Sequence, residues 1–138
     1  MDKLFTLDEA NRALPLVRSI TRDAVSRYRA VKSEINALSS LNAQRAAGAE
    51  IADATVDRQD QVIARQLYEM QRLIDELEAI GCRLRDYQKG VVDFPAALMH
   101  EDQFAYYCWI LGEGHVTHWH SEEEGYDRRR LVSEKAST

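Results

Sequence analysis

The sequence predicts an α+β protein, in which a long antiparallel helical hairpin with coiled-coil-like spacing precedes a small antiparallel β-sheet of three or four strands. Apolar residues recur at alternating spacings of three and four through most of residues 1–80, which is typical of paired helices. After Gly81, short β-branched and aromatic runs between Gly and Pro residues indicate strands. We expect one domain over residues 1–138, with the hairpin in 1–80, the sheet in 81–121 and a charged, flexible tail in 122–138.

The first helix begins with a capping signal. Thr6 and Glu9 have the spacing of a capping box, so a short helix is expected to start there. Pro15 lacks a backbone N–H and suits a first helical turn, so the main helix is expected to begin or kink around Leu14 and Pro15. The apolar seam that follows has one polar member and consists of Leu14, Val17, Thr21, Ala24, Tyr28, Val31, Ile35 and Leu38.

A second helix follows a turn predicted in residues 42–50, where the seam is lost and a Gly occurs. Its seam consists of Ile63, Leu67, Met70, Ile74, Leu77 and, past Gly81, Leu84. Two antiparallel helices shield only one stripe of each other from water, so something else must cover the hairpin. The candidates for this cover are the C-terminal strands and a second copy of the chain. We expect a homodimer that forms through the helical hairpin, with a four-helix bundle as the natural outcome.

The sheet is predicted as two hairpins joined by a loop. Residues 83–87 and 90–94 have the pattern of short strands, and Pro95 is expected to end the second of them. A polar loop is expected over residues 96–103. The second hairpin follows, with strands at 104–111 and 115–120.

Two histidines share one face of the last predicted strand. His118 and His120 are separated by one residue, and side chains alternate between the faces of a strand. The register of the hairpin decides their neighbours. A three-residue loop of residues 112–114 places Cys108 opposite His118 and Tyr106 opposite His120, whereas a two-residue loop brings Trp109 opposite His118 and removes the thiol from the group.

His, Cys and carboxylate side chains are the ligands that transition metals prefer. The candidate metal ligands are His118, His120 and Cys108, with Asp93 as the fourth, because a carboxylate among Val and Phe residues is costly to bury unless it is paired or ligating. Such a mixed set suits zinc or a related transition metal better than calcium or magnesium. In the alternative interpretation, Asp93 lies on a solvated face, and the aromatic and histidine residues only pack the sheet.

The function predicted on this basis is metal binding through the His-x-His strand. The alternative is a non-enzymatic dimeric helical scaffold or protein-interaction module, in which the apolar seams of the hairpin mediate self-association or bind a partner helix. The chain contains no nucleophile elbow, no phosphate-binding glycine loop and no His-Glu-x-x-His helix, so the sequence favours no particular reaction.

Composition sets the remaining expectations. The chain has 138 residues, 30% of them charged, and a formal net charge of −5, which disfavours nucleic acid as a partner. No apolar run is long enough to span a bilayer, and residues 1–6 lack the pattern of an export signal, so we expect no membrane partner and a cytoplasmic location. Cys82 and Cys108 lie far apart in the sequence and are expected to be reduced thiols.

Three motifs together resemble a known family. They are residues 5–11 with Leu14 and Pro15, residues 90–96, and a third set formed by residues 108–109, 111–113, 116 and 118–120. On these residues the chain resembles the prokaryotic domain-of-unknown-function family 2203. The resemblance implies a small bacterial cytosolic protein with a helical hairpin and a C-terminal sheet, and it brings no established activity.

Overall fold

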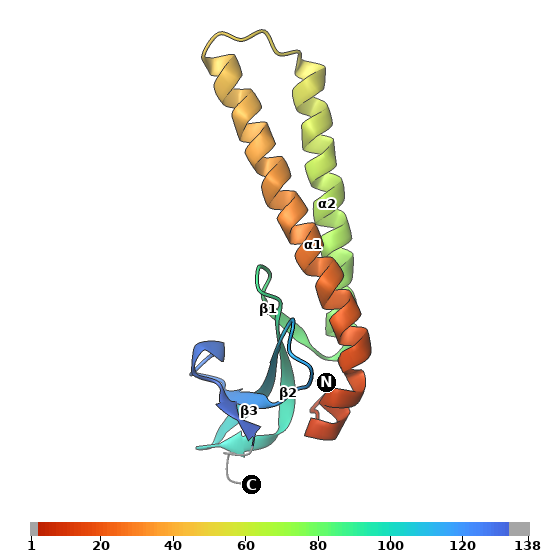
Figure 1. Cartoon of the computed structure of the whole chain (residues 1–138), viewed down its shortest axis with the longest axis vertical. Coiled ribbons are helices and arrows are strands. Elements are labelled where there is room, and N and C mark those ends of the chain that lie inside the picture. The colour runs from red at the N-terminus through yellow and green to blue at the C-terminus, as the bar shows by residue number, and fades with distance from the viewer. Residues whose placement is uncertain (1–2, 133–138) are drawn as a thin grey trace.

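A computed structural model describes residues 3–132, and it confirms the α+β class (Figure 1). Two long helices, α1 (Leu7–Ala46) and α2 (Asp53–Ile80), form an antiparallel hairpin. A five-stranded antiparallel sheet follows at the base of the hairpin, with its strands in sequence order. The strands and one short 3-10 helix are β1 (Arg83–Asp86), β2 (Val91–His100), β3 (Gln103–Ile110), β4 (His118–Ser121), η1 (Tyr126–Arg128) and β5 (Arg130–Leu131).

The predicted capping box starts α1, and Pro15 lies inside the helix rather than at its beginning. The Thr6 hydroxyl accepts a hydrogen bond from the Glu9 amide, and the Glu9 carboxylate accepts one from the Thr6 amide. The expectation that the main helix begins at Leu14 and Pro15 is therefore wrong. The Pro15 ring faces solvent, while Leu14 and Val17 beside it are buried, so packing on both sides of the proline holds the helix together.

The hairpin is well packed at its base and exposed towards its far end. All buried residues of α1 lie between Ala10 and Val31, and those of α2 are Ile74 and Leu77. Further out, the predicted seam residue Ile35 is 47% exposed and Leu67 is 43% exposed. The seams therefore form a closed core only where the sheet covers them.

One face of the sheet packs on the base of the hairpin. The core joins aromatic and aliphatic residues of the strands to residues of both helices, and its largest members are Phe5, Phe94, Trp109, Trp119, Leu77 and Val17. Because side chains alternate along each strand, the intervening residues point to the opposite face. This second face carries the polar residues, and Figure 1 shows η1 on that side, away from the helices.

Strand β2 is longer than predicted and replaces the expected loop at residues 96–103. It runs through Pro95 to His100, and a tight turn at Glu101 and Asp102, both with positive φ, leads into β3. Pro95 is tolerated because the ladder to β3 shifts register after it, and because Phe5 pairs with the other edge of β2 at this point. Such a long-range partner is not visible in local sequence patterns.

Strand β4 is shorter than predicted, because a residue of α1 takes the hydrogen bonds of the backbone just before it. The Asn11 side chain accepts a hydrogen bond from the Val116 amide at 2.8 Å and donates one to the Val116 carbonyl at 3.2 Å. Val116 is therefore held by α1 and not by the ladder to β3, while the Thr117 carbonyl accepts a hydrogen bond from the Val132 amide. The strand begins only at His118.

Part of the predicted tail belongs to the fold. The structure gives residues 122–132 a 3-10 turn and a fifth strand, one strand more than the predicted maximum. Arg129 forms an ion pair with Glu113 at 2.6 Å, and Arg130 forms one with Glu124 at 2.7 Å. The part of the predicted tail in residues 133–138 lies outside the described residues. Neither long helix among the described residues has a stretch apolar enough to cross a membrane.

Candidate metal centre

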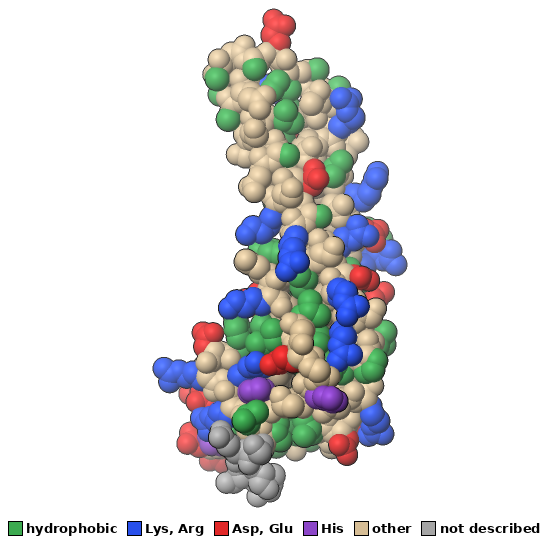
Figure 2. All heavy atoms as spheres, in the orientation of Figure 1, with side chains coloured by type: hydrophobic (Ala, Val, Ile, Leu, Met, Phe, Trp, Pro, Cys, Tyr) green, Lys and Arg blue, Asp and Glu red, His purple; other side chains and the backbone are tan. Residues whose placement is uncertain are grey.

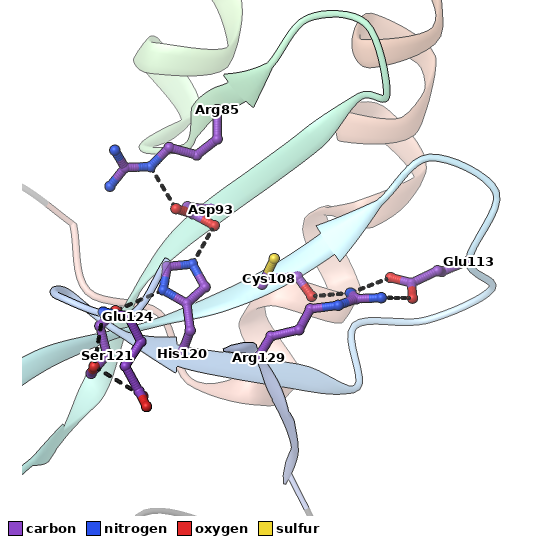
Figure 3. A network of polar contacts seen from close by, with 8 residues as sticks. All are labelled: Arg85, Asp93, Cys108, Glu113, His120, Ser121, Glu124 and Arg129. Carbon is purple, nitrogen blue, oxygen red and sulfur yellow. Dashed lines mark hydrogen bonds and ion pairs between the residues drawn. The ribbon is translucent and has the colours of Figure 1, made fainter. Parts of the chain in front are cut away.

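Three predicted ligands meet on the polar face of the sheet, one from each of three neighbouring strands. Asp93 lies on β2 and pairs in register with Cys108 on β3, while His120 lies on β4. All three are buried, and each offers one ligand atom within 4.8 Å of the others (Figure 3). We call these three residues the polar cluster. Its members come together because two consecutive hairpins set the registers of β2, β3 and β4.

The observed register is the one expected from a three-residue loop. Cys108 pairs with His118, and Tyr106 pairs with His120. His118 thus lies on the same face as the polar cluster, directly across from the thiol, but it does not join the set of close ligand atoms. Its Nδ1 lies 2.9 Å from the hydroxyl of Thr117. The pKa of His118 is lowered by partial burial and by the charge of Arg129.

The proton arrangement at His120 follows from its two partners. Its Nδ1 lies 2.8 Å from the carbonyl oxygen of Ser121, which only accepts hydrogen bonds, so Nδ1 carries a proton. Its Nε2 lies 3.0 Å from Oδ1 of Asp93, and this contact needs a second proton. Burial lowers the pKa of His120, but the hydrogen bond and the negative charge of Asp93 outweigh it and raise the pKa above its ordinary value. The short contact between Nε2 and Oδ1 thus joins the imidazole ring to the carboxyl group of Asp93 inside the sheet.

Asp93 is satisfied on both of its oxygens. Arg85 on β1 donates from Nε to the Oδ2 atom at 2.6 Å, while His120 takes Oδ1 (Figure 3). Only 1% of Asp93 is exposed, so the alternative in which it lies on a solvated face is wrong. The sequence reasoning did not identify Arg85 as a partner. The sequence does contain a signal for this partner. A buried carboxylate requires a cation or a ligand, and Arg85 lies in the neighbouring predicted strand.

The thiol of Cys108 is protonated in the metal-free protein. Burial raises its pKa to about 12, and the neighbouring negative charge of Asp93 acts in the same direction. A buried thiol of this kind is a poor nucleophile at neutral pH. A bound transition metal ion would stabilise its thiolate form.

The donor set fits a small transition metal ion. Tetrahedral zinc has ligand bonds of about 2.0–2.3 Å, which puts neighbouring ligand atoms roughly 3.3–3.8 Å apart. The three atoms of the polar cluster already lie within 4.8 Å of one another, so side-chain shifts of about 1 Å suffice. Ser121 fixes the ring of His120 so that Nε2 is presented, and Arg85 orients the carboxylate of Asp93, which are the usual supports of metal ligands.

A second polar contact closes the same face. Arg129 donates to both carboxylate oxygens of Glu113, at 2.9 and 2.6 Å, and to the carbonyl oxygen of Cys108 at 3.4 Å. Glu113 also accepts a hydrogen bond from the amide of Ile110. The segment after β4 is thus tied across β3, and it helps to exclude water from the polar cluster.

The fold and the cluster define a class of protein: an α+β chain in which a helical hairpin covers one face of an antiparallel sheet, and a buried Asp-Cys-His set occupies the other. The chain belongs to the DUF2203 family, described as an uncharacterised conserved protein, whose model matches residues 3–132. No curated protein and no solved structure matches the chain.

Proposed function

We propose that the protein binds a divalent transition metal, with zinc the best fit, through Asp93, Cys108 and His120. The observation that carries the proposal is the meeting of three buried ligand atoms of suitable chemistry within 4.8 Å. Nε2 of His120 and Oδ1 of Asp93 lie 3.0 Å apart, and a metal held by these residues would replace the hydrogen bond between them. Three protein ligands leave a fourth coordination position free, as in catalytic rather than structural zinc sites.

The proposal is tested by metal loading of the full chain purified without a His tag or chelator. We expect near-stoichiometric zinc by elemental mass spectrometry, and a thiolate-to-metal absorption band when cobalt replaces zinc. Cys108→Ser keeps the size of the side chain but removes the soft ligand, so it should abolish the band and weaken zinc binding. His118→Ala is the matched control, because it removes an imidazole from the same face outside the polar cluster.

Two results would contradict the proposal. One is a wild-type chain that takes up no zinc or cobalt under loading conditions. The other is a Cys108→Ser variant that binds both ions as the wild type does. Loss of metal in His118→Ala with retention in Cys108→Ser would transfer the role of Cys108 to His118, the predicted ligand that lies outside the polar cluster.

We propose as a second function that two copies of the chain pair through the hairpin. The observation that favours it is the exposure of large apolar residues beyond the reach of the sheet, including Ile35, Leu67 and Tyr68, the last at 65%. Charge supports a second copy as the occupant, because residues 12–32 of α1 carry six basic side chains and one acid, while residues 69–78 of α2 carry four acids and one base. Basic side chains are prominent along the middle of the hairpin in Figure 2. A two-fold pairing that sets α1 against α2 of the other copy joins opposite charges.

Sedimentation equilibrium tests this pairing. We expect a dimeric mass for the wild type and a monomeric mass for the double variant Ile35→Asp, Leu67→Glu, because a charge on this surface cannot be buried without a partner. The control is Leu16→Glu, which places a charge on an exposed apolar residue of the hairpin base. A monomeric wild type at every concentration would refute the pairing.

A further inference from the structure

A groove of about 540 Å³ opens beside the polar cluster. Its walls come from the end of α2, from the segment before α1 and from strands β1, β2 and β3. Asp93 is the one member of the polar cluster that lines it, so the groove leads from solvent to the carboxylate side of the cluster. Its volume is in the range of pockets that hold small metabolites, roughly 300–1,000 Å³.

Three hydrogen-bond donors on separate segments line this groove: Arg83, Lys3 and Tyr106. Arg83 pairs in register with Asp93 and so lies on the same face of the sheet, but Asp93 is already held by Arg85. Within residues 3–132, the Arg83 guanidinium and the Tyr106 hydroxyl make no hydrogen bond or ion pair. Lys3 makes one, at 3.3 Å to Glu9, and remains nearly half exposed. Two of the three donors are therefore free to meet a ligand.

We infer that this groove binds a small oxyanion, a carboxylate or a phosphate group, held by Arg83 and Tyr106 next to the metal bound by the polar cluster. The inference rests on the proposed metal site, which would supply a free coordination position at the inner end. The planar guanidinium of Arg83 matches two oxygens of such a group at once. Tyr106 adds a phenol donor from β3, and its ring packs against His120 at 5.7 Å between centroids.

One carboxylate opposes the anion. Glu78 also lines the groove, at the end of α2, where the last helix carbonyls carry partial negative charge. Arg83 and Tyr106 line the groove from the sheet, whereas Glu78 lines it from the end of α2. An oxyanion belongs at the sheet side, and removing the charge of Glu78 should strengthen its binding.

The test is a titration of the full chain with inorganic phosphate and, separately, with acetate, followed by amide chemical shifts of the zinc-loaded and the metal-free forms. We expect saturable shifts confined to the groove, at residues such as Cys82 and Tyr106. Arg83→Gln should weaken binding by about tenfold, the value of one lost charged hydrogen bond. Glu78→Gln should tighten binding, and Arg58→Gln, on an exposed arginine near the far end of the hairpin, should leave it unchanged.

The outcomes separate the two proposals. If zinc does not bind, the proposed metal site fails, and the titration of the metal-free form still reports on the groove. If zinc binds and neither anion gives saturable groove shifts in either form, the oxyanion site is refuted while the metal site stands. Equal affinity in wild type and Arg83→Gln also overturns the inference. Saturation by either anion, weakened in Arg83→Gln, supports it and identifies which oxyanion is preferred.

Discussion

Gly90 sits where the sheet meets the hairpin, and replacing it with Ala should destabilise the fold strongly. Its φ is +76°, in the left-handed region that favours glycine, and a Cβ there would lie 2.8 Å from Cβ of Leu111. The same Cβ would lie 3.1 Å from Val25 and 3.2 Å from Thr21, both on α1. The backbone of Gly90 is also fixed, since its amide donates to Asp86 and its carbonyl accepts from Leu111. Neither the backbone nor the neighbours can therefore move away freely.

The cost has three parts. The left-handed conformation costs an L-residue about 1–2 kcal/mol. Overpacking against Leu111 and α1 adds roughly 1–3 kcal/mol. Ala also reduces the conformational entropy of the unfolded chain, and this offsets about 0.4–1 kcal/mol of the loss. The net loss in the free energy of unfolding is about 1–4.6 kcal/mol, which corresponds to roughly 3–14 °C in Tm for a chain of this size.

The assay is urea denaturation followed by circular dichroism, with Gly48→Ala as the matched control. Gly48 also has a positive φ, +100°, but a Cβ there would have no neighbour within 4 Å. The control should lose about 0–1.6 kcal/mol, because it has the conformational cost without the overpacking. If Gly90→Ala loses no more stability than Gly48→Ala, the close approach of the sheet to α1 is not a constraint and the reasoning is refuted.

Two further predictions concern the packing and the pH dependence of the fold. Leu77→Ala, at a fully buried site, should cost about 2–5 kcal/mol, while Leu16→Ala, at a residue 59% exposed, should cost under about 1 kcal/mol; equal losses in thermal unfolding would contradict the assigned core. Burial raises the pKa of Glu113. The hydrogen bond and the charge of Arg129 lower the pKa by a larger amount, so it lies below the ordinary value. Glu113→Gln should therefore cost stability at neutral pH, by about 1–2 kcal/mol. The ion pair contributes its full stabilisation above the ordinary pKa of Glu113, and this contribution is lost as pH falls through the lowered pKa. The difference in stability between Glu113→Gln and wild type should therefore vanish in acid. A difference in stability that grows in acid would refute the assignment.

The sequence predicted the elements that depend on local patterns. Alternating spacings of three and four located both helices, and the capping signal at Thr6 located the start of α1 to one residue. The glycine-containing loop at 112–114 left two registers open, and the structure has the one in which Cys108 faces His118. These features depend on neighbours that are close in sequence, so a local pattern carries them.

The elements that the sequence did not predict depend on distant partners. Strand β2 continues past Pro95 because Phe5 pairs with its edge, and β4 begins late because Asn11 holds Val116. The fifth strand exists because Arg129 and its neighbours fold back over β3 and β4. None of these contacts has a signature within a window of a few residues.

The site depends on these same distant contacts through strand register. Asp93, Cys108 and His120 come from three strands, and a slip of one residue between any two strands would send one ligand to the apolar face. Two sets of local contacts fix the registers. Gly90 closes the turn before β2 against α1, and Glu113 accepts from the Ile110 amide while it anchors Arg129 beside Cys108. Perturbing either set of contacts should therefore weaken metal binding as well as stability, although neither residue offers a ligand to the polar cluster.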